Sequence, residues 1–257
     1  MPTFTHGKST RVLLDKYDAT YWLRDAQWAN AVDVAETSAF GSTAKTYVVG
    51  QNGFTMQMNG MYDETASTGF DAVASNLLGQ ETSIVTAIAP RNTDAGNKVW
   101  ACQGYITAYQ VQGTVGDMVS AGVQIQGSDT VRQGVSLQKH TTAVSATGTG
   151  TTVNLGTSPS ASTAFGAQAF LFVPTNTRDA GTLSVTVEHS TNGSVWGALD
   201  GGFTFPNVTA GTANVTSAYK ATAASATVNQ YVRVNYTVTG GTTGSYFFTV
   251  IFVRLPQ

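Results

Sequence analysis

The sequence predicts a mainly β protein: an N-terminal β-sandwich or barrel with one packed α-helix, then a C-terminal all-β sandwich of immunoglobulin-like or jelly-roll type. Three observations predict this class. Apolar and polar residues alternate in several short runs, as they do in half-buried strands. Only one segment carries an apolar stripe of helical period. The second half combines short alternating runs with many glycine turns.

Two strands are expected near the N-terminus. Val12–Leu14 is a short apolar run ended by Asp15. In the second strand, apolar residues alternate with polar ones, which gives one apolar and one polar face: Phe54, Met56 and Met58 against Thr55, Gln57 and Asn59.

A long span separates these two strands and holds few large apolar residues. The exceptions are Phe40, Tyr47, Val48 and Val49, bracketed by Gly41 and Gly50. Long loops without a core of their own are uncommon in compact domains, and they usually serve function or contact a partner. We therefore expect a functional loop from about Glu36 to Gly50.

One helix and three further strands are expected in the first half. The apolar stripe of the helix consists of Phe70, Val73, Ala74, Leu77 and Leu78, with Thr68 as its N-cap and Gly79 as its C-terminal stop. The strands that follow are expected at 83–89, 98–111 and 118–126.

The second half predicts an eight- to nine-stranded sandwich. Residues 183–187 and 232–238 alternate, whereas Tyr246–Val253 is apolar on both faces, as expected for a central strand covered on each side. The run Ser190-Thr191-Asn192-Gly193-Ser194-Val195-Trp196 is typical of a hairpin turn, in which glycine supplies the positive φ and the tryptophan packs beneath.

Charge divides the chain into two domains. Residues 1–140 hold 21 charged side chains and residues 141–257 hold seven. The break falls in a Thr/Ser/Gly-rich stretch with a short strand near Val153. We therefore predict a first domain at 1–140, a flexible linker at 141–165 and a projecting β-sandwich at 166–257.

Composition argues against several function classes. Net charge is -2, with 11% charged residues and no basic stripe, so tight nucleic-acid binding is not expected. A single cysteine, Cys102, forms no intrachain disulfide. No signal peptide or transmembrane segment is expected.

No catalytic, metal or phosphate motif is found. Gly7-Lys8-Ser9 lacks the upstream glycine of a phosphate-binding loop, and the three histidines, His6, His140 and His189, lie far apart. We expect a protein that is not an enzyme and has no cofactor.

Motifs in the first half resemble a known family. HGK-x-x-R-V-L, A-E-T-S-A-F-G and K-T-Y-V-x-G come in that order, before an alternating strand that ends in Gly-Met-Tyr-Asp. This combination resembles the major tail tube proteins of long-tailed, siphovirus-type bacteriophages over roughly residues 1–140.

The resemblance implies a virion structural protein made in the host bacterial cytoplasm. Copies would join sheet edges into hexameric rings, and stacked rings would form a tube through which DNA passes without specific binding. Other partners would be the tape measure and tail terminator proteins.

Two sets of residues are predicted to serve this assembly. The loop that would contact the next ring or a neighbouring subunit offers Glu36, Phe40, Lys45, Tyr47, Val48 and Val49. Arg11, Arg24 and Lys45 either pair with Asp33 or Glu36 of another subunit or stay solvated. The candidates for the channel wall are Thr55, Gln57, Asn59, Ser120, Gln124 and Gln126, although these residues could equally face outer solvent.

Two alternatives stay open. The C-terminal domain could be a carbohydrate-binding or adhesion module that contacts cell-surface glycans through Trp196. The chain could also be a related ring-forming secretion or injection tube protein, which would use the same physical surfaces.

Overall fold

The computed structural model describes residues 5–38, 43–128, 131–156 and 165–255. The fold is mainly β with one α-helix, which confirms the predicted class. The chain forms two compact units. We call the first, formed by Met1–Thr20, Val85–Ala101 and Arg132–Gln257, the sandwich unit, and the second, formed by Tyr21–Ile84 and Cys102–Val131, the arm unit.

These units do not follow the predicted boundaries at 140 and 165. Strands on either side of those boundaries pair with each other, because β8 (Arg132–Ser136) pairs with β18 (Tyr246–Arg254). The predicted division into functional domains stays a prediction.

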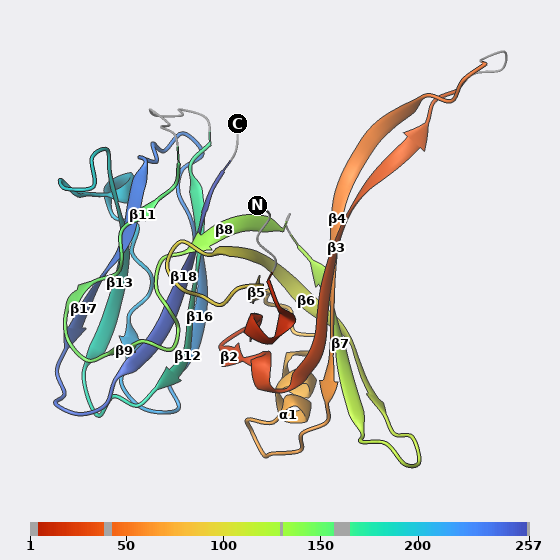
Figure 1. The fold of residues 1–257 in the computed structure, drawn as a ribbon, viewed down its shortest axis with the longest axis horizontal. Helices are drawn as coiled ribbons and strands as arrows, with labels where there is room; N and C mark the ends of the chain where they lie inside the picture. Colours follow the sequence, from red (N-terminus) through yellow and green to blue (C-terminus); the bar gives the residue numbers. More distant parts are fainter. Residues whose placement is uncertain (1–4, 39–42, 129–130, 157–164, 256–257) are drawn as a thin grey trace. The chain divides into compact units, whose positions relative to one another are not determined.

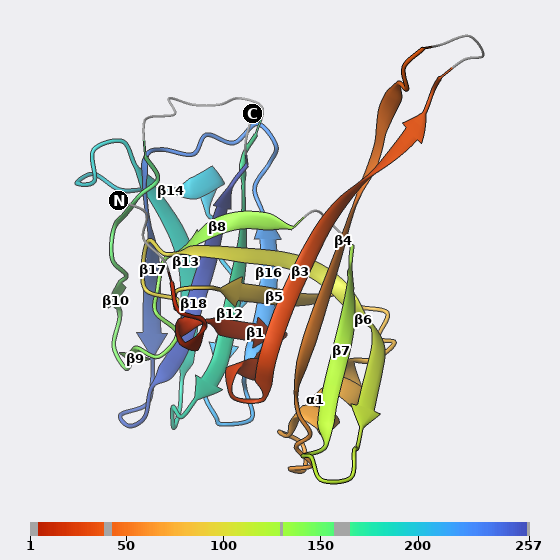
Figure 2. The same ribbon diagram turned by 45° about the vertical axis from the view of Figure 1, so that its right-hand side comes forward.

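The arm unit is a four-stranded antiparallel sheet with one helix. Its strand order is β3–β4–β7–β6 (Figure 2), with each neighbour antiparallel. Its elements are β3 (Leu23–Glu36), β4 (Tyr47–Met61), α1 (Phe70–Leu77), β7 (Ser120–Gly127) and the part of β6 (Lys98–Gln112) that follows Ala101. The strands predicted at 98–111 and 118–126 are confirmed as β6 and β7.

Helix α1 is held by aromatic packing. Phe70 is fully buried and stacks on Trp22 with ring centroids 5.6 Å apart, while Tyr109 meets it edge-on at 6.4 Å. The N-cap is Gly69, with no side-chain hydrogen bond, so the predicted Thr68 cap is wrong by one residue. The helix ends at Leu77 and its C-cap Leu78 is already extended, so the predicted stop at Gly79 comes one residue too late; Gly79, with a φ of 71°, instead donates its N–H to the Ile106 carbonyl.

The sandwich unit contains two sheets. One has the order β16–β12–β18–β8–β6–β5–β1–β2, with β9 also on β18; the other has the order β10–β17–β13–β14, with β11 on β17 and β15 on β13. The bounds not yet given are β1 (Arg11–Leu14), β2 (Tyr17–Asp18), β5 (Ile84–Ala89), β9 (Ala143–Val144), β10 (Gly148–Thr149), β11 (Val153–Asn154), β12 (Ala167–Asn176), β13 (Thr182–Ser190), β14 (Gly197–Ala198), β15 (Val208–Thr209), β16 (Thr216–Ala221) and β17 (Tyr231–Thr239). Three 3-10 turns lie at Gly7–Ser9, Ala19–Tyr21 and Leu199–Gly201.

Strand β18 is buried on both faces. Phe248 and Phe252 belong to a core shared with β13 and β17, whereas Ile251 and Val253 pack with residues of β5 and β1. This arrangement confirms the prediction of a central strand from its continuous apolar run.

Part of the expected linker belongs to the sandwich. Val144 of β9 and Val153 of β11 are buried in the same core as β18. The rest of the expected linker includes residues 157–164, which lie outside the described residues.

Candidate assembly surfaces

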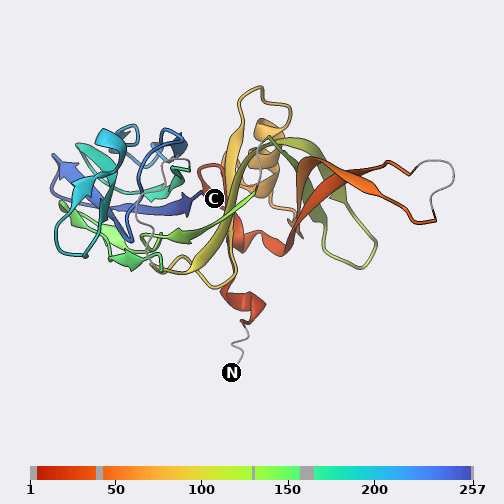
Figure 3. The same ribbon diagram turned by 90° about the horizontal axis from the view of Figure 1, so that it is seen from above.

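The β3–β4 hairpin extends beyond the other two strands of its sheet (Figures 1 and 3). We call residues 31–36 of β3 and 47–53 of β4 the arm. Every residue of the arm is exposed, whereas the other end of β4 buries Phe54, Met56 and Met58. At about 3.3 Å per residue, the six β3 residues of the arm span roughly 20 Å.

One face of the arm continues the buried face of the sheet. Trp28 pairs with Met56, and alternation along β3 brings Val32 and Val34 to the same face. Val34 pairs with Val49, and both are exposed, Val49 by 72%. The apolar face therefore runs out along the arm without any cover from the described residues.

The predicted loop from Glu36 to Gly50 is wrong in its secondary structure. Glu36 is the last residue of β3, and Tyr47, Val48 and Val49 begin β4, so only residues 37–46 connect the strands. The reason is that a two-stranded ladder satisfies the backbone polar groups here even without a buried face.

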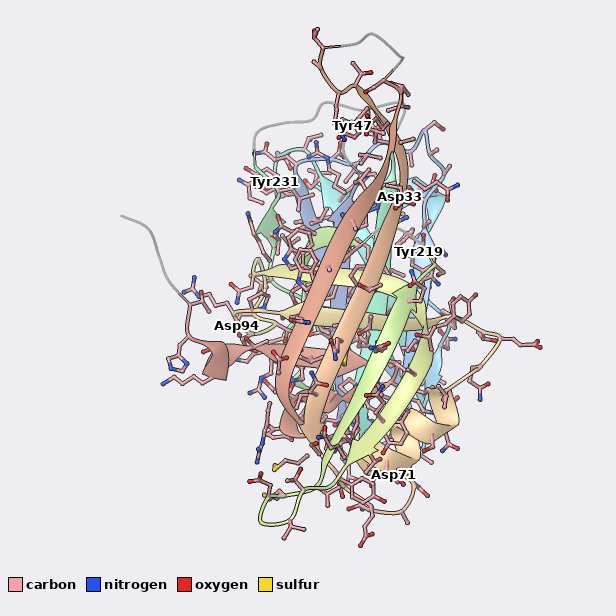
Figure 4. The ribbon with its side chains drawn as sticks, turned by 90° about the vertical axis from the view of Figure 1, so that its right-hand side faces the viewer. Asp33, Tyr47, Asp71, Asp94, Tyr219 and Tyr231 are labelled. Carbon is pink, nitrogen blue, oxygen red and sulfur yellow. The ribbon has the colours of Figure 1, made fainter. Side chains whose placement is uncertain are left out.

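The side chains predicted for this loop divide into three cases. Tyr47, Val48 and Val49 are exposed, and Tyr47 lies on the arm in Figure 4. Lys45 Nζ is 3.0 Å from Glu36 Oε2, so these two residues pair within the chain. Phe40 lies outside the described residues.

The six candidates for the channel wall share one face of the sheet. Thr55 pairs with Gln126, Gln57 with Gln124 and Asn59 with Gly122, while Ser120 lies two residues beyond Gly122 on β7. The alternating residues of the same strands are buried on the opposite face. Whether this polar face lines a channel stays a prediction.

Amide groups connect the strands on this polar face. Gln27 Nε2 donates to Gln57 Oε1 at 3.3 Å, and Gln126 Nε2 donates to the Phe54 carbonyl at 3.0 Å. Together with Thr55 and Gln124, these amides line a shallow hollow of about 220 Å³. Such groups hydrate a surface without carrying charge.

Sequence reasoning missed one charged group on this face. Asp25 of β3 pairs with Asn59, whose Nδ2 is 3.5 Å from Asp25 Oδ2. The face is therefore not wholly uncharged. The sequence does not predict β3 as a strand, so nothing in it places Asp25 beside Asn59.

Both edges of the four-stranded sheet are open among the described residues. β3 pairs only with β4 along its 14 residues. β6 pairs only with β7 beyond Ile106, where Leu78 makes the last bridge on its other side. Open edges present unpaired N–H and C=O groups, which are ready to pair with another strand.

Trp196 is held against the sandwich unit. Arg233 lies over its ring, with Cζ 4.1 Å from the ring centroid, and Arg233 Nε donates to Glu188 Oε2 at 2.8 Å. Asn235 donates to the other oxygen of Glu188 at 2.8 Å. The guanidinium occupies one face of the ring, and a sugar contact on the other face stays a prediction.

A buried Asp–His–Thr group lies in the sandwich unit. His140 Nδ1 is 2.6 Å from Thr93 Oγ1, and His140 Nε2 is 3.3 Å from Asp18 Oδ2. Burial alone would raise the pKa of Asp18. The hydrogen bonds from His140 and Thr20 lower it by more than burial raises it, so the pKa lies below its ordinary value. Thr93 is completely buried, so its hydroxyl is closed to a substrate.

Tyr109 and Asp71 form a second polar contact, in the arm unit. Tyr109 donates from its hydroxyl to Asp71 Oδ1 at 2.7 Å. Burial and the neighbouring carboxylate raise the pKa of Tyr109 far above its usual value, so the phenol stays protonated and ties α1 to β6. Asp71 is labelled in Figure 4.

The described ranges hold neither a cluster of metal ligands nor a membrane-spanning helix. His, Cys, Asp and Glu side chains do not gather there in a group of three that could hold a metal ion. Among the helices of those ranges, none combines the length and apolar character needed to span a bilayer.

No family model and no curated protein matches the chain. Solved structures of virions and tails do match. The virion of a native gene transfer agent particle is 13% identical over 50% of this chain and 97% of that chain, with a TM-score of 0.38. The SPP1 tail tube is 11% identical over 51% and 78%, with a TM-score of 0.40.

A third match spans nearly the whole chain. The SPP1 Dit protein, described as a paradigm of the hub adsorption apparatus in phages that infect Gram-positive bacteria, is 10% identical over 96% of this chain and 99% of that chain, with a TM-score of 0.37. The likeness is too weak to carry conclusions about function, which rest on the chain's own residues.

Proposed function

We propose that this protein is a structural subunit of a tube: a major tail tube protein of a long-tailed bacteriophage. The observation that carries the proposal is the four-stranded sheet with two open edges and an arm whose apolar face is uncovered. The open edges leave backbone N–H and C=O groups unpaired, and the uncovered face of the arm leaves apolar side chains in water. A second copy would satisfy them.

The direction of the strands suits closure into a ring. Four strands that alternate in direction leave the two outermost ones, β3 and β6, antiparallel to each other. When β3 of one copy meets β6 of the next, the junction therefore continues the antiparallel pattern. Six copies would close into one barrel without a free edge, which removes the tendency of open edges to aggregate.

The polar face would then form the wall of the channel. Its Thr, Ser, Asn and Gln side chains hold water but do not pair with phosphate, and the carboxylate of Asp25 repels phosphate. DNA could pass such a wall without being retained, since retention needs clustered Lys and Arg.

The arm would join one ring to the next. Fully burying one exposed side chain of the size of valine or leucine stabilises an interface by roughly 1.5–3 kcal/mol. Each copy in a ring would contribute one arm, so this gain would be repeated around the ring. The sandwich unit would decorate the tube, and the tape measure and tail terminator proteins would be further partners in the virion. An injection tube would use the same surfaces; the phage tail is chosen on the sequence motifs.

Removal of the arm tests this function. In the variant, residues 34–49 are replaced by Asn-Gly, a two-residue hairpin turn that joins Asp33 to Gly50. Negative-stain microscopy should show rings and hollow tubes for the wild-type chain and rings without tubes for the variant. Its circular dichroism and melting temperature should match the wild type. A wild-type chain that stays monomeric at high concentration contradicts the proposal.

A further inference from the structure

Strand register places two exposed apolar clusters at opposite ends of the arm unit's sheet. β3 begins beside the end of β4, enters the arm at Ala31 and ends at Glu36. Ser120 of β7 pairs with both Met61 of β4 and Gln112 of β6. The segment 113–119, which we call the β6–β7 turn, therefore lies at the end where β3 begins, far from the arm (Figure 1).

The β6–β7 turn is apolar although it is exposed. Val115 is fully exposed and Met118 is 65% exposed. Val111 and Val119, beside and within the turn, are exposed by 50% and 42%. Four such side chains close together in sequence form an apolar patch of the kind that marks an interaction site.

Each end also carries a charge that forms no ion pair with any described residue. Asp33 lies on the arm (Figure 4), between Val32 and Val34. At the other end, Arg24 Nη2 is 3.8 Å from Met118 Sδ, so the guanidinium borders the β6–β7 turn. The arm therefore offers one negative charge, on the face opposite Val34, and the other end offers Arg24 beside the exposed Asp117 of the turn itself.

We propose that the arm of one copy docks on the β6–β7 turn of a copy in the next ring. Val34 and Val49 contact Val115 and Met118, while Asp33 pairs with Arg24 of the other copy. This inference rests on the proposed function and adds the surface that receives the arm. Arg24 then binds between subunits, whereas Lys45 pairs with Glu36 of its own chain.

The position of the two patches explains why stacking would continue. A contact between two different patches is heterologous and repeats without end when the repeat does not close on itself. If a patch bound the same patch on another copy, the contact would join two rings and leave no patch free for a third. Patches at opposite ends of one sheet allow each ring to receive an arm at one end and to extend an arm at the other.

Two single substitutions test the contact. Val49→Asp places a charge on the arm, and Val115→Asp places one on the turn; both sites are exposed, so folding should be unaffected. Each variant should form rings but no tubes by negative-stain microscopy and sedimentation. Val195→Asp is the matched control, because Val195 is also an exposed valine, 73% exposed, in a hairpin turn of the sandwich unit. It should form tubes of normal length.

A mixture of preformed rings gives the sharper test. Rings of Val49→Asp keep an intact turn, and rings of Val115→Asp keep an intact arm. The mixture should therefore contain one working contact per pair and yield stacks of two rings, with no longer tubes. A mixture that remains single rings overturns the proposal, since it shows that these two surfaces do not meet.

Other outcomes separate this inference from the proposed function. If Val115→Asp forms full-length tubes while Val49→Asp does not, the arm docks elsewhere and only the inference fails. If the wild-type chain forms no rings, the proposed function itself fails. Charge reversal adds a check: Asp33→Arg and Arg24→Glu should each shorten tubes several-fold at low salt, and the double variant should restore their length. No recovery in the double variant overturns the Asp33–Arg24 pair.

Discussion

β18 and the arm place the same kinds of residue in opposite surroundings. In β18, Phe248 and Phe252 face one core and Ile251 faces another, and all three are fully buried. In the arm, Val34 and Val49 face no second layer. β-branched and aromatic residues thus support folding where the chain covers both faces and remain available for association where it does not.

This contrast predicts that stability and assembly can be changed separately. A substitution in β18 should lower the free energy of unfolding, because every neighbour that it loses belongs to the same chain. A substitution in the arm should leave that free energy unchanged and act only on contacts between copies. The following predictions test the separation from the largest expected effect to the smallest.

Phe248→Ala should give the largest loss of stability. Phe248 is completely buried and meets Tyr236 edge-on with ring centroids 5.5 Å apart. Truncation leaves a cavity in a packed core, at a cost of about 3–5 kcal/mol in the free energy of unfolding. Denaturant titration followed by circular dichroism measures it.

The matched arm substitution is Val49→Ala. An exposed site away from special backbone features usually changes stability by about 0.5 kcal/mol or less. Similar losses for Phe248→Ala and Val49→Ala would show that the arm is covered within the single chain, and the contrast would be lost.

Asp18→Asn should have an intermediate effect. The carboxylate accepts hydrogen bonds from the His140 ring and the Thr20 backbone in the sandwich unit. A hydrogen bond to a charged group contributes about 1.5–3 kcal/mol, so the variant should lose an amount of this order at neutral pH. Denaturant titration of both proteins measures the difference.

The same pair predicts how stability depends on pH. Because the pKa of Asp18 in the folded state lies below its ordinary value of 3.8, its ionised form stabilises the fold. That contribution is present above pH 3.8 and is lost as the pH falls through the folded-state pKa. The difference between wild type and Asp18→Asn should therefore shrink on acidification below 3.8; a constant difference would contradict this assignment.

Sequence reasoning succeeded where one face or both faces of a strand are buried. In β7, Val123 and Ile125 alternate with exposed polar residues because the sheet covers one face only, and that alternation is visible in the sequence. β18 was predicted for the opposite reason, since a strand covered on both sides needs no polar positions.

The arm and β3 could not be predicted in the same way. Where β3 is exposed on both faces, no buried side requires regular alternation, and Asn30 interrupts the apolar positions between Trp28 and Val32. The arm was read as a loop, although its apolar residues were found. Asp25 on the polar face was missed with β3. The compact units were also beyond local patterns, because they depend on pairings such as Arg11 with Ala89 and Ile251 with Ser136.

Lys45→Gln should have the smallest effect and sharpens the comparison within the arm itself. The Lys45–Glu36 pair is exposed, with 68% and 42% of the two side chains accessible, and both partners come from one chain. Isolated exposed ion pairs of this kind often contribute nothing measurable to stability, and both partners lie in one chain, so neither stability nor tube length should change. Asp33→Arg differs, because its partner belongs to another copy. Tubes shortened as strongly by Lys45→Gln as by Asp33→Arg would show that Lys45 contacts a neighbouring subunit, and the arm's charge contacts would need reassignment.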